Sequence, residues 1–159
     1  MISQTVEYAM RAMSFLASLD GQAANCESIA RGTRVPQGYL SKVMRDLVCA
    51  DLVKSYRGPN GGFMLARPPG EITLLDIVNA VDPIRRIDRC PIDNPDHGDL
   101  CALHRCLDDA LAHMERTFRQ TTLGGVLSQD RCSDSGCRTL FTPTTPQTQG
   151  VSHERDAQS

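Results

Sequence analysis

The chain has 159 residues, a length that suits one domain or a small domain with an appendage. Tryptophan is absent and aromatic residues make up 4% of the chain, so a core must be built from aliphatic side chains and methionine. No apolar run reaches the roughly 18 residues of a membrane span, and the N-terminal apolar stretch contains charges, unlike a signal peptide. We expect a cytoplasmic protein without membrane association, whose seven cysteines are reduced thiols or ligands.

The formal net charge of −2 conceals an uneven distribution. Residues 1–67 hold eight Lys or Arg against five Asp or Glu, a balance of +3. Residues 68–159 hold nine against fourteen, a balance of −5. A basic half beside an acidic half indicates a polyanionic partner at one end of the molecule, and the small excess makes this a weak signal by itself.

The first fifty residues predict three helices. Residues 3–19 place apolar side chains at steps of three and four, and Ser3 could cap this helix. A short helix over 27–31 follows, with Asn25 as N-cap, then a turn at Gly32-Thr33 and a helix that opens at Val35-Pro36. Two short helices joined by a glycine-containing turn are typical of a helix-turn-helix. The apolar face of the third helix is expected to hold Tyr39, Leu40, Val43, Met44, Leu47 and Val48.

A β-hairpin is predicted directly after the third helix. Residues 52–57 and 63–66 favour strands, and the Gly-, Pro- and Asn-rich residues 58–62 between them favour a turn. After a hinge at 67–70, a further helix begins near Thr73, a good N-cap with Asp76 in its first turn, and Asp82-Pro83 ends it. Residues 1–82 are therefore predicted to form a winged helix-turn-helix DNA-binding domain, in a mainly α fold with a small β-hairpin wing.

The candidate DNA contacts lie on the third helix and the wing. The recognition helix of a helix-turn-helix places its N-terminal residues against base edges in the major groove. Arg57, before the wing tip, could reach phosphate or the narrow minor groove, whereas Arg31, Arg34, Arg45 and Lys54 suit phosphate contacts. The alternative is that these are ordinary solvated charges. The predicted DNA-binding residues are Gln37, Tyr39, Ser41, Lys42, Arg45, Arg57 and Asn60.

Thiols and imidazoles gather in one stretch. Residues 90–106 hold Cys90, His97, Cys101, His104 and Cys106, side chains of the types that bind zinc and iron–sulfur clusters. Residues 83–99 are predicted to be a Cys-bearing sensor loop. Residues 100–127 are predicted to form a long dimerisation helix with a short cap, because apolar residues recur at 103, 107, 111, 114 and 118. Residues 128–159 are predicted to be a disordered tail.

Several of these motifs together resemble one known family. The segment from Tyr8 to Met13, the helix-turn-helix, the wing ADLVKSYRGPNGG, the helix ITLLDIVNAVD and the Cys-bearing helix resemble the winged-helix regulators that include IscR, NsrR and RirA (the Rrf2 family). The resemblance covers roughly residues 1–127. It implies a homodimeric transcription regulator, a repressor, that binds double-stranded promoter DNA. It also implies an iron–sulfur cluster that responds to nitric oxide, iron supply or redox state.

The resemblance implies a ligand set that stays partly open. Cys101 falls where cluster-binding relatives have the last of three cysteines, His104 falls where an IscR-type histidine ligand lies, and Cys90 fits an upstream cysteine. The middle cysteine has no counterpart. Glu7 of the partner subunit could supply an oxygen donor, or Cys106 could complete a three-cysteine set if the helix starts later than predicted. A 2Fe–2S cluster is favoured over a 4Fe–4S cluster, with zinc as the alternative.

Two rival functions follow from the same residues. One is a metal-free winged-helix regulator whose thiols are oxidised directly. The other is an enzyme that uses a Cys/His pair as nucleophile and base. Cys101 and His104 lie on one helical turn, and no Asp or Asn is placed to orient the histidine, so we expect no enzymatic activity. His97 could replace one of the metal ligands.

Overall fold

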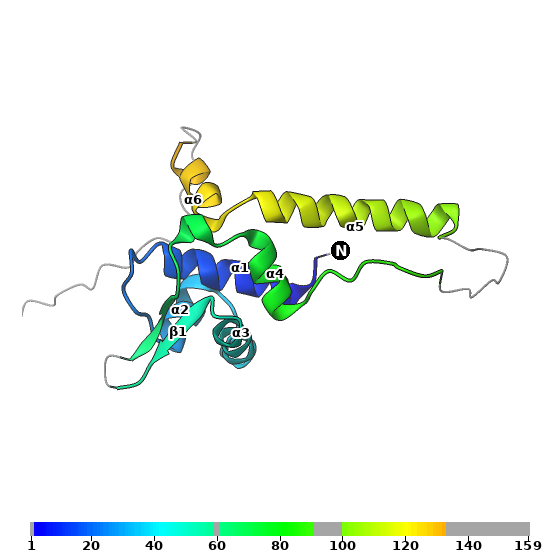
Figure 1. The fold of residues 1–159 in the computed structure, drawn as a ribbon. Coiled ribbons are helices and arrows are strands. Elements are labelled where there is room, and N and C mark those ends of the chain that lie inside the picture. Colours follow the sequence, from blue (N-terminus) through cyan, green and yellow to red (C-terminus); the bar gives the residue numbers. More distant parts are fainter. Residues whose placement is uncertain (1, 59–60, 91–99, 133–159) are drawn as a thin grey trace, which may run out of the picture.

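The structure is a computed structural model that describes residues 2–58, 61–90 and 100–132 (Figure 1). Asn60 and His97 lie outside the described residues, as do residues 133–159, which make up most of the predicted tail. The elements in chain order are α1 (Gln4–Ala17), α2 (Cys26–Thr33), α3 (Gln37–Cys49), β1 (Val53–Tyr56), β2 (Gly62–Leu65), the 3-10 helix η1 (Pro69–Glu71), α4 (Leu74–Val81), α5 (Ala102–Gln120) and α6 (Leu123–Cys132). The predicted fold class, mainly α with a β-hairpin wing, is confirmed.

The helix starts follow from side-chain caps. The Asn25 side chain accepts a hydrogen bond from the backbone N–H of Ser28 at 2.8 Å, and so satisfies a donor that α2 leaves unpaired at its start. Thr73 and Asp76 form a reciprocal capping box at α4, with hydrogen bonds of 3.1 and 2.9 Å. Ser3 caps α1 through a longer hydrogen bond of 3.4 Å. All three caps were predicted from the sequence.

The turn between α2 and α3 differs from the prediction. The predicted turn residues Gly32 and Thr33 are helical, and the chain reverses at Arg34, whose φ of 55° lies in the left-handed region. A Cβ at Gly32 would lie 2.3 Å from Cε2 of the Phe15 ring, so a side chain there would have to displace that ring. Thr33 is buried and donates to the carbonyl of Ile29 at 2.7 Å, which extends α2 by a residue beyond the glycine.

The wing is tied to the helix-turn-helix by main-chain hydrogen bonds. β1 and β2 pair antiparallel, with Val53 opposite Leu65 and Tyr56 opposite Gly62. Phe63 exchanges two further backbone hydrogen bonds with Ala24, of 2.8 and 2.9 Å, just before α2. A Cβ at Gly62 would lie 2.5 Å from the Ala24 carbonyl oxygen, so glycine is required for this close approach. The start of β2 is therefore fixed relative to the segment that precedes α2.

The core surrounds α1, which packs against α2, α3, α4 and the wing (Figure 1). Met13 and Leu16 are buried there among aliphatic and methionine side chains, as the lack of aromatic residues predicts. The fully buried side chains with the largest volumes also include Ile29, Leu40, Met44, Leu47, Leu52, Ile72, Ile77 and Leu123.

The long helix α5 projects from this core (Figure 1). Its C-terminal end is held by a hydrogen bond of 2.9 Å from Leu74 N to Thr121 O and by one of 2.8 Å from Leu123 N to Ile72 O. None of the residues of α5 is buried. The last helix ends at Cys132 instead of Leu127, so residues 128–132, predicted to begin the tail, are helical. No helix in the described part of the chain is long and apolar enough to cross a membrane.

Candidate DNA-binding surface and metal centre

The first turns of α3 present polar side chains to solvent. Gln37 begins the helix, and Gln37, Ser41, Lys42 and Arg45 are all exposed. Ser41 donates to the carbonyl of Gln37 at 3.1 Å, which turns its hydroxyl toward its own helix. The side chains of Gln37, Lys42 and Arg45 make no such bond to the Gln37 carbonyl. Their donors lie on the first turns of α3, the part of a recognition helix that enters the major groove.

Tyr39 was predicted to lie on the apolar face of α3, and this prediction is wrong. The residue is 63% exposed, and its ring centroid lies 6.1 Å from that of Tyr8 on α1, at an interplanar angle of 58°. The core side of this turn is occupied by Leu40 and Val43, which leaves Tyr39 on the rim between α1 and α3. Its exposure is compatible with the second prediction made for it, a contact with DNA.

The other basic residues of this half vary in availability. Arg57 and Lys54 are exposed on the wing, and Arg34 is exposed at the turn. Arg31 forms an ion pair of 3.0 Å with Glu27 on the same helix, with both side chains more than 70% exposed. Such a pair contributes little to stability and would yield to a phosphate contact.

Three predicted metal ligands converge at the start of α5. Cys90 ends the described part of the linker after α4, Cys101 is the N-cap of α5, and His104 lies in its first turn. The Nδ1 atom of His104 lies 3.1 Å from Sγ of Cys101 and 3.5 Å from Sγ of Cys90. All three donor atoms lie within 4.8 Å of one another, and all three residues are half-buried. The linker after α4 and the start of α5 thus contribute ligand atoms to the same site.

The surroundings of Cys101 favour its thiolate form. Interactions of the sulfur with the backbone N–H of His104, and then with the His104 side chain and Cys90, lower the pKa of the Cys101 thiol to about 7. Position at the beginning of a helix acts in the same direction, because the first-turn N–H groups carry partial positive charge. The thiolate is the form that binds metal.

The dimensions of this trio fit a tetrahedral metal. Bond lengths of about 2.3 Å to sulfur and about 2.0 Å to nitrogen place neighbouring ligand atoms about 3.5 Å apart in a tetrahedron. The distances of 3.1 and 3.5 Å are of this size. Cysteine and histidine also ligate iron in iron–sulfur proteins, so the donor types suit both zinc and a cluster. Three donors leave a fourth position for another ligand.

Two other predicted ligands lie outside this group. Cys106 is exposed on α5, and Glu7 is exposed on α1, where it forms an ion pair with Arg11. Among the residues that the structure describes, neither belongs to the convergent group. Counting only residues 2–58, 61–90 and 100–132, the group within one chain has three members.

An ion pair one helical turn from the trio was not predicted from the sequence. Asp108 accepts hydrogen bonds from Nε of Arg86 at 2.6 Å and from the backbone N–H of Ile87 at 2.9 Å. Nη1 of Arg86 also lies 3.7 Å from Glu115. The hydrogen bonds from Arg86 and Ile87 lower the pKa of Asp108 to about 2. The only sequence signal was the i, i+4 spacing of His104 and Asp108, which puts both on one face of α5.

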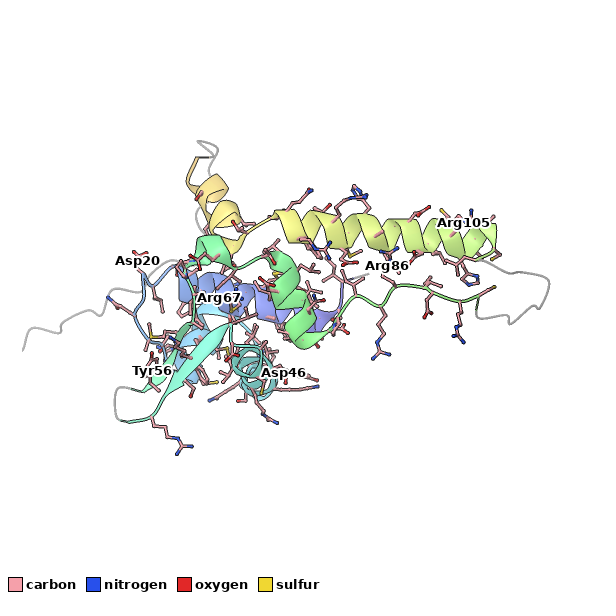
Figure 2. The ribbon with its side chains drawn as sticks, viewed as in Figure 1. Asp20, Asp46, Tyr56, Arg67, Arg86 and Arg105 are labelled. Atoms are coloured by element: carbon pink, nitrogen blue, oxygen red, sulfur yellow. The ribbon has the colours of Figure 1, made fainter. Side chains whose placement is uncertain are left out.

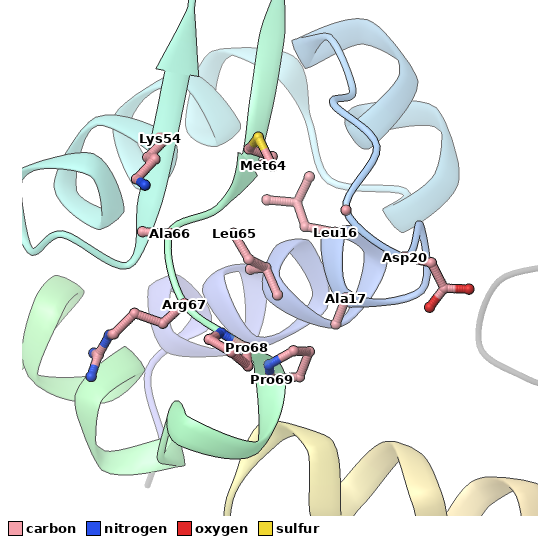
Figure 3. A pocket seen from close by; sticks show the side chains of 11 residues that line it. Leu16, Ala17, Asp20, Lys54, Met64, Leu65, Ala66, Arg67, Pro68 and Pro69 are labelled. Atoms are coloured by element: carbon pink, nitrogen blue, oxygen red, sulfur yellow. The ribbon is translucent and has the colours of Figure 1, made fainter.

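A groove of about 370 Å³ lies beside the wing (Figure 3). Leu16 and Ala17 of α1 form one wall, and Leu65 with Pro68 and Pro69 forms the other. Lys54 and Arg67 lie on one side of its mouth and Asp20 on the other (Figure 3). It offers a shallow apolar surface with charges at the edge, remote from the metal trio along the chain.

A helix-turn-helix with an exposed recognition helix, a β wing and a projecting helix defines the class of winged-helix DNA-binding regulators. The family model for Rrf2, described as iron-dependent transcriptional regulator, matches residues 2–129. The chain belongs to this family.

Relatives and solved structures agree with this assignment. The chain is 30% identical over 139 residues to the HTH-type transcriptional regulator NsrR of Geobacillus kaustophilus, covering 83% of this chain and 92% of the relative. The structure of CymR, the global cysteine regulator of B. subtilis, matches with a TM-score of 0.67 and 27% identity, covering 81% of this chain and 97% of that one. IscR of T. potens matches with a TM-score of 0.66 and 26% identity, over 81% and 87%.

Proposed function

We propose that this protein is a homodimeric repressor whose affinity for double-stranded promoter DNA is controlled by a metal centre on Cys90, Cys101 and His104. The observation that carries the proposal is the convergence of these three donors within 4.8 Å at the start of α5. They join the linker that follows α4 to the N-terminal end of α5. A change at this site therefore acts on the connection between the two.

An iron–sulfur cluster is the proposed cofactor, with a 2Fe–2S cluster favoured over a 4Fe–4S cluster. The family description and the similarity to NsrR and IscR support it. Such a cluster would supply sensitivity to iron supply, oxidants or nitric oxide. Glu7 of a second copy of the chain is the proposed fourth ligand, and it would have to exchange its ion pair with Arg11 for the metal. Cys106 is the alternative.

Zinc is the second candidate, because the distances of 3.1 and 3.5 Å already suit one tetrahedral ion. A metal-free thiol regulator is a further alternative. Its support is the lowered pKa of Cys101 beside a second thiol, a pair that an oxidant could join directly.

Homodimer formation is proposed through α5. Leu103 and Leu107 are 64% and 47% exposed, and Leu111, Met114 and Phe118 continue the same face at steps of three and four. Apolar side chains at this spacing form a stripe that a second helix of the same kind can cover. A dimer would present two α3 helices to successive major grooves of a palindromic site, about 34–36 Å apart.

The coupling would run through α4, which packs on α1 and α3 and leads into the linker. Ligation of Cys90 would fix the end of the linker against the start of α5, and loss of ligation would release that end. The position of α3 relative to its copy then changes with the state of the metal site. A coupling free energy of about 1–3 kcal/mol gives a 5–150-fold change in DNA affinity.

Iron, sulfide and zinc analysis of anaerobically purified protein tests the metal centre. Coloured protein with iron and sulfide is expected, and Cys101→Ser and His104→Ala should lose the colour, whereas Cys106→Ser should keep it if Glu7 is the fourth ligand. Colourless protein without iron refutes the cluster, and stoichiometric zinc replaces it. Gel-shift titration of metal-loaded and metal-free protein on its own promoter tests the switch, and equal affinities would refute metal control.

A further inference from the structure

We propose that Arg86 and Asp108 form a clamp that positions Cys90 for metal binding. The inference deepens the proposed function and rests on its metal centre. Asp108 lies on α5 one turn after His104, and Arg86 lies on the linker four residues before Cys90. The clamp and the metal trio are thus two adjacent contacts between the same two segments, the linker over 83–90 and α5.

Cys90 needs such a device because its own segment has little structure. Residues 83–90 form no helix or strand, and most of them are exposed. Cys101 and His104 are held by α5, whereas the linker must lose conformational freedom before Cys90 can bind. A contact that fixes the linker in advance removes part of this entropic cost from metal binding.

The contacts fix both side chain and main chain. Arg86 donates to both carboxylate oxygens of Asp108, at 2.6 Å through Nε, and Ile87 donates its backbone N–H at 2.9 Å. The main-chain hydrogen bond anchors the linker three residues before Cys90, a stretch that spans at most about 11 Å. Cys90 is thereby confined to the neighbourhood of His104.

The register of the two segments agrees with this role. Residues 86 and 87 contact position 108, and residue 90 contacts position 104, so the linker runs antiparallel to α5. Figure 2 shows the linker passing alongside α5 at Arg86. Because positions four apart lie on one helix face, the clamp and the trio share that face.

The clamp is stronger than an ordinary surface ion pair. The Asp108 side chain is 14% exposed, and its pairing with Arg86 is bidentate, a geometry that adds both strength and orientation. Glu115, 3.7 Å from Nη1 of Arg86, holds the guanidinium from a second side. Groups that hydrogen-bond metal ligands directly contribute about 10–100-fold to metal affinity, and the clamp, which acts through the linker, is expected at the low end of that range.

Cobalt titration of the full-length protein tests the clamp. Arg86→Gln and Asp108→Ala should weaken Co²⁺ binding about tenfold. They should also lower the sulfur-to-cobalt charge-transfer absorption, because Cys90 leaves the metal while Cys101 remains. Arg86→Lys keeps the charge but loses the bidentate geometry, so it should fall between wild type and Arg86→Gln. Arg85→Gln, a charge-matched change at the adjacent exposed residue, should bind as wild type does.

A purely structural role predicts a different pattern. It would lower thermal stability without changing the number of thiolates on cobalt. Variants that bind Co²⁺ with wild-type affinity and wild-type charge-transfer intensity overturn the proposal, as does an equal effect of Arg85→Gln. Far-ultraviolet circular dichroism checks that each variant is folded.

A metal-free measurement separates failure of the clamp from failure of the metal centre. Glutathione disulfide oxidises the Cys90 and Cys101 thiols to one disulfide and is reduced to two glutathione thiols, and peptide mapping in a Cys106→Ser background quantifies the bond. The clamp variants should form this disulfide about tenfold less favourably than wild type. If wild-type protein binds no metal, the proposed function fails, and this equilibrium still decides the clamp. Equal equilibrium constants for disulfide formation in wild type and the clamp variants would overturn the proposed clamp.

Discussion

Replacing Leu103 and Leu107 together by alanine should dissociate the dimer. Fully burying a leucine contributes about 2 kcal/mol. With exposed fractions of 64% and 47%, covering both side chains gives about 2 kcal/mol per chain and about 4 kcal/mol in a symmetric pair. Alanine keeps roughly a quarter to a third of this, so the loss is about 3 kcal/mol. The dimer dissociation constant should rise about 100-fold.

Sedimentation velocity over a range of protein concentrations measures this constant. Arg116→Ala is the matched control, because residue 116 is exposed on the opposite side of α5. The helix itself should persist, since neither leucine is buried in the single chain. An unchanged dissociation constant in the double variant, or a wild-type protein that stays monomeric at high concentration, would refute the assignment of this stripe as the dimer interface.

Four further outcomes are expected. In metal-free protein, the rate of alkylation of Cys101 by iodoacetamide should rise with pH through a midpoint near 7. The reason is that the lowered pKa makes the thiolate available at a pH below the usual pKa of thiols. A midpoint near 9 would contradict the described interactions of the sulfur. Gln37→Ala should weaken binding to the cognate operator by about 1–3 kcal/mol with little effect on unrelated DNA. Arg45→Ala should weaken binding to both DNAs and reduce the slope of log affinity against log salt concentration by about one. Identical behaviour of the two variants in fluorescence anisotropy would argue against α3 as the recognition helix. Thr73→Ala should lower the free energy of unfolding by about 1 kcal/mol in urea titration, and Ser3→Ala by less because its cap bond is 3.4 Å long; the reverse order would be inconsistent with the cap geometry. Gly62→Ala should lower the free energy of unfolding by about 1–3 kcal/mol in the same assay, since its Cβ would lie 2.5 Å from the Ala24 carbonyl oxygen. An unchanged free energy of unfolding would show that the wing can move away from α2.

The sequence predicted what depends on neighbouring residues. The caps at Ser3, Asn25 and Thr73 each involve a backbone N–H three residues away, so a short motif suffices to identify them. The hairpin follows from two strand-forming runs around a glycine-rich turn. The family resemblance added the expectation of metal ligands at Cys90, Cys101 and His104. The residue types alone indicated a metal site, but they did not decide which residues are its ligands.

The turn between α2 and α3 shows where local signals mislead. Glycine ordinarily marks a turn, yet Gly32 is helical, and the ring of Phe15 lies where its side chain would be. Tyr39 has the apolar spacing of α3, yet it is 63% exposed because the core on that turn is already filled by Leu40 and Val43. For Gly32 the neighbouring side chain belongs to another helix, α1, and for Tyr39 the face that turns inward is decided by how α3 packs on the core.

The tertiary structure alone decided which donors meet. Cys90 and His104 are 14 residues apart and Arg86 and Asp108 are 22 apart, with residues 91–99 between the two segments. Composition and periodicity describe each segment, but they carry no information about the register between a linker and a helix. That register depends on where α4 and α6 leave the two segments in space. Among the residues that the structure describes, this register brings Cys90, Cys101 and His104 together, whereas Cys106 and Glu7 lie outside the group.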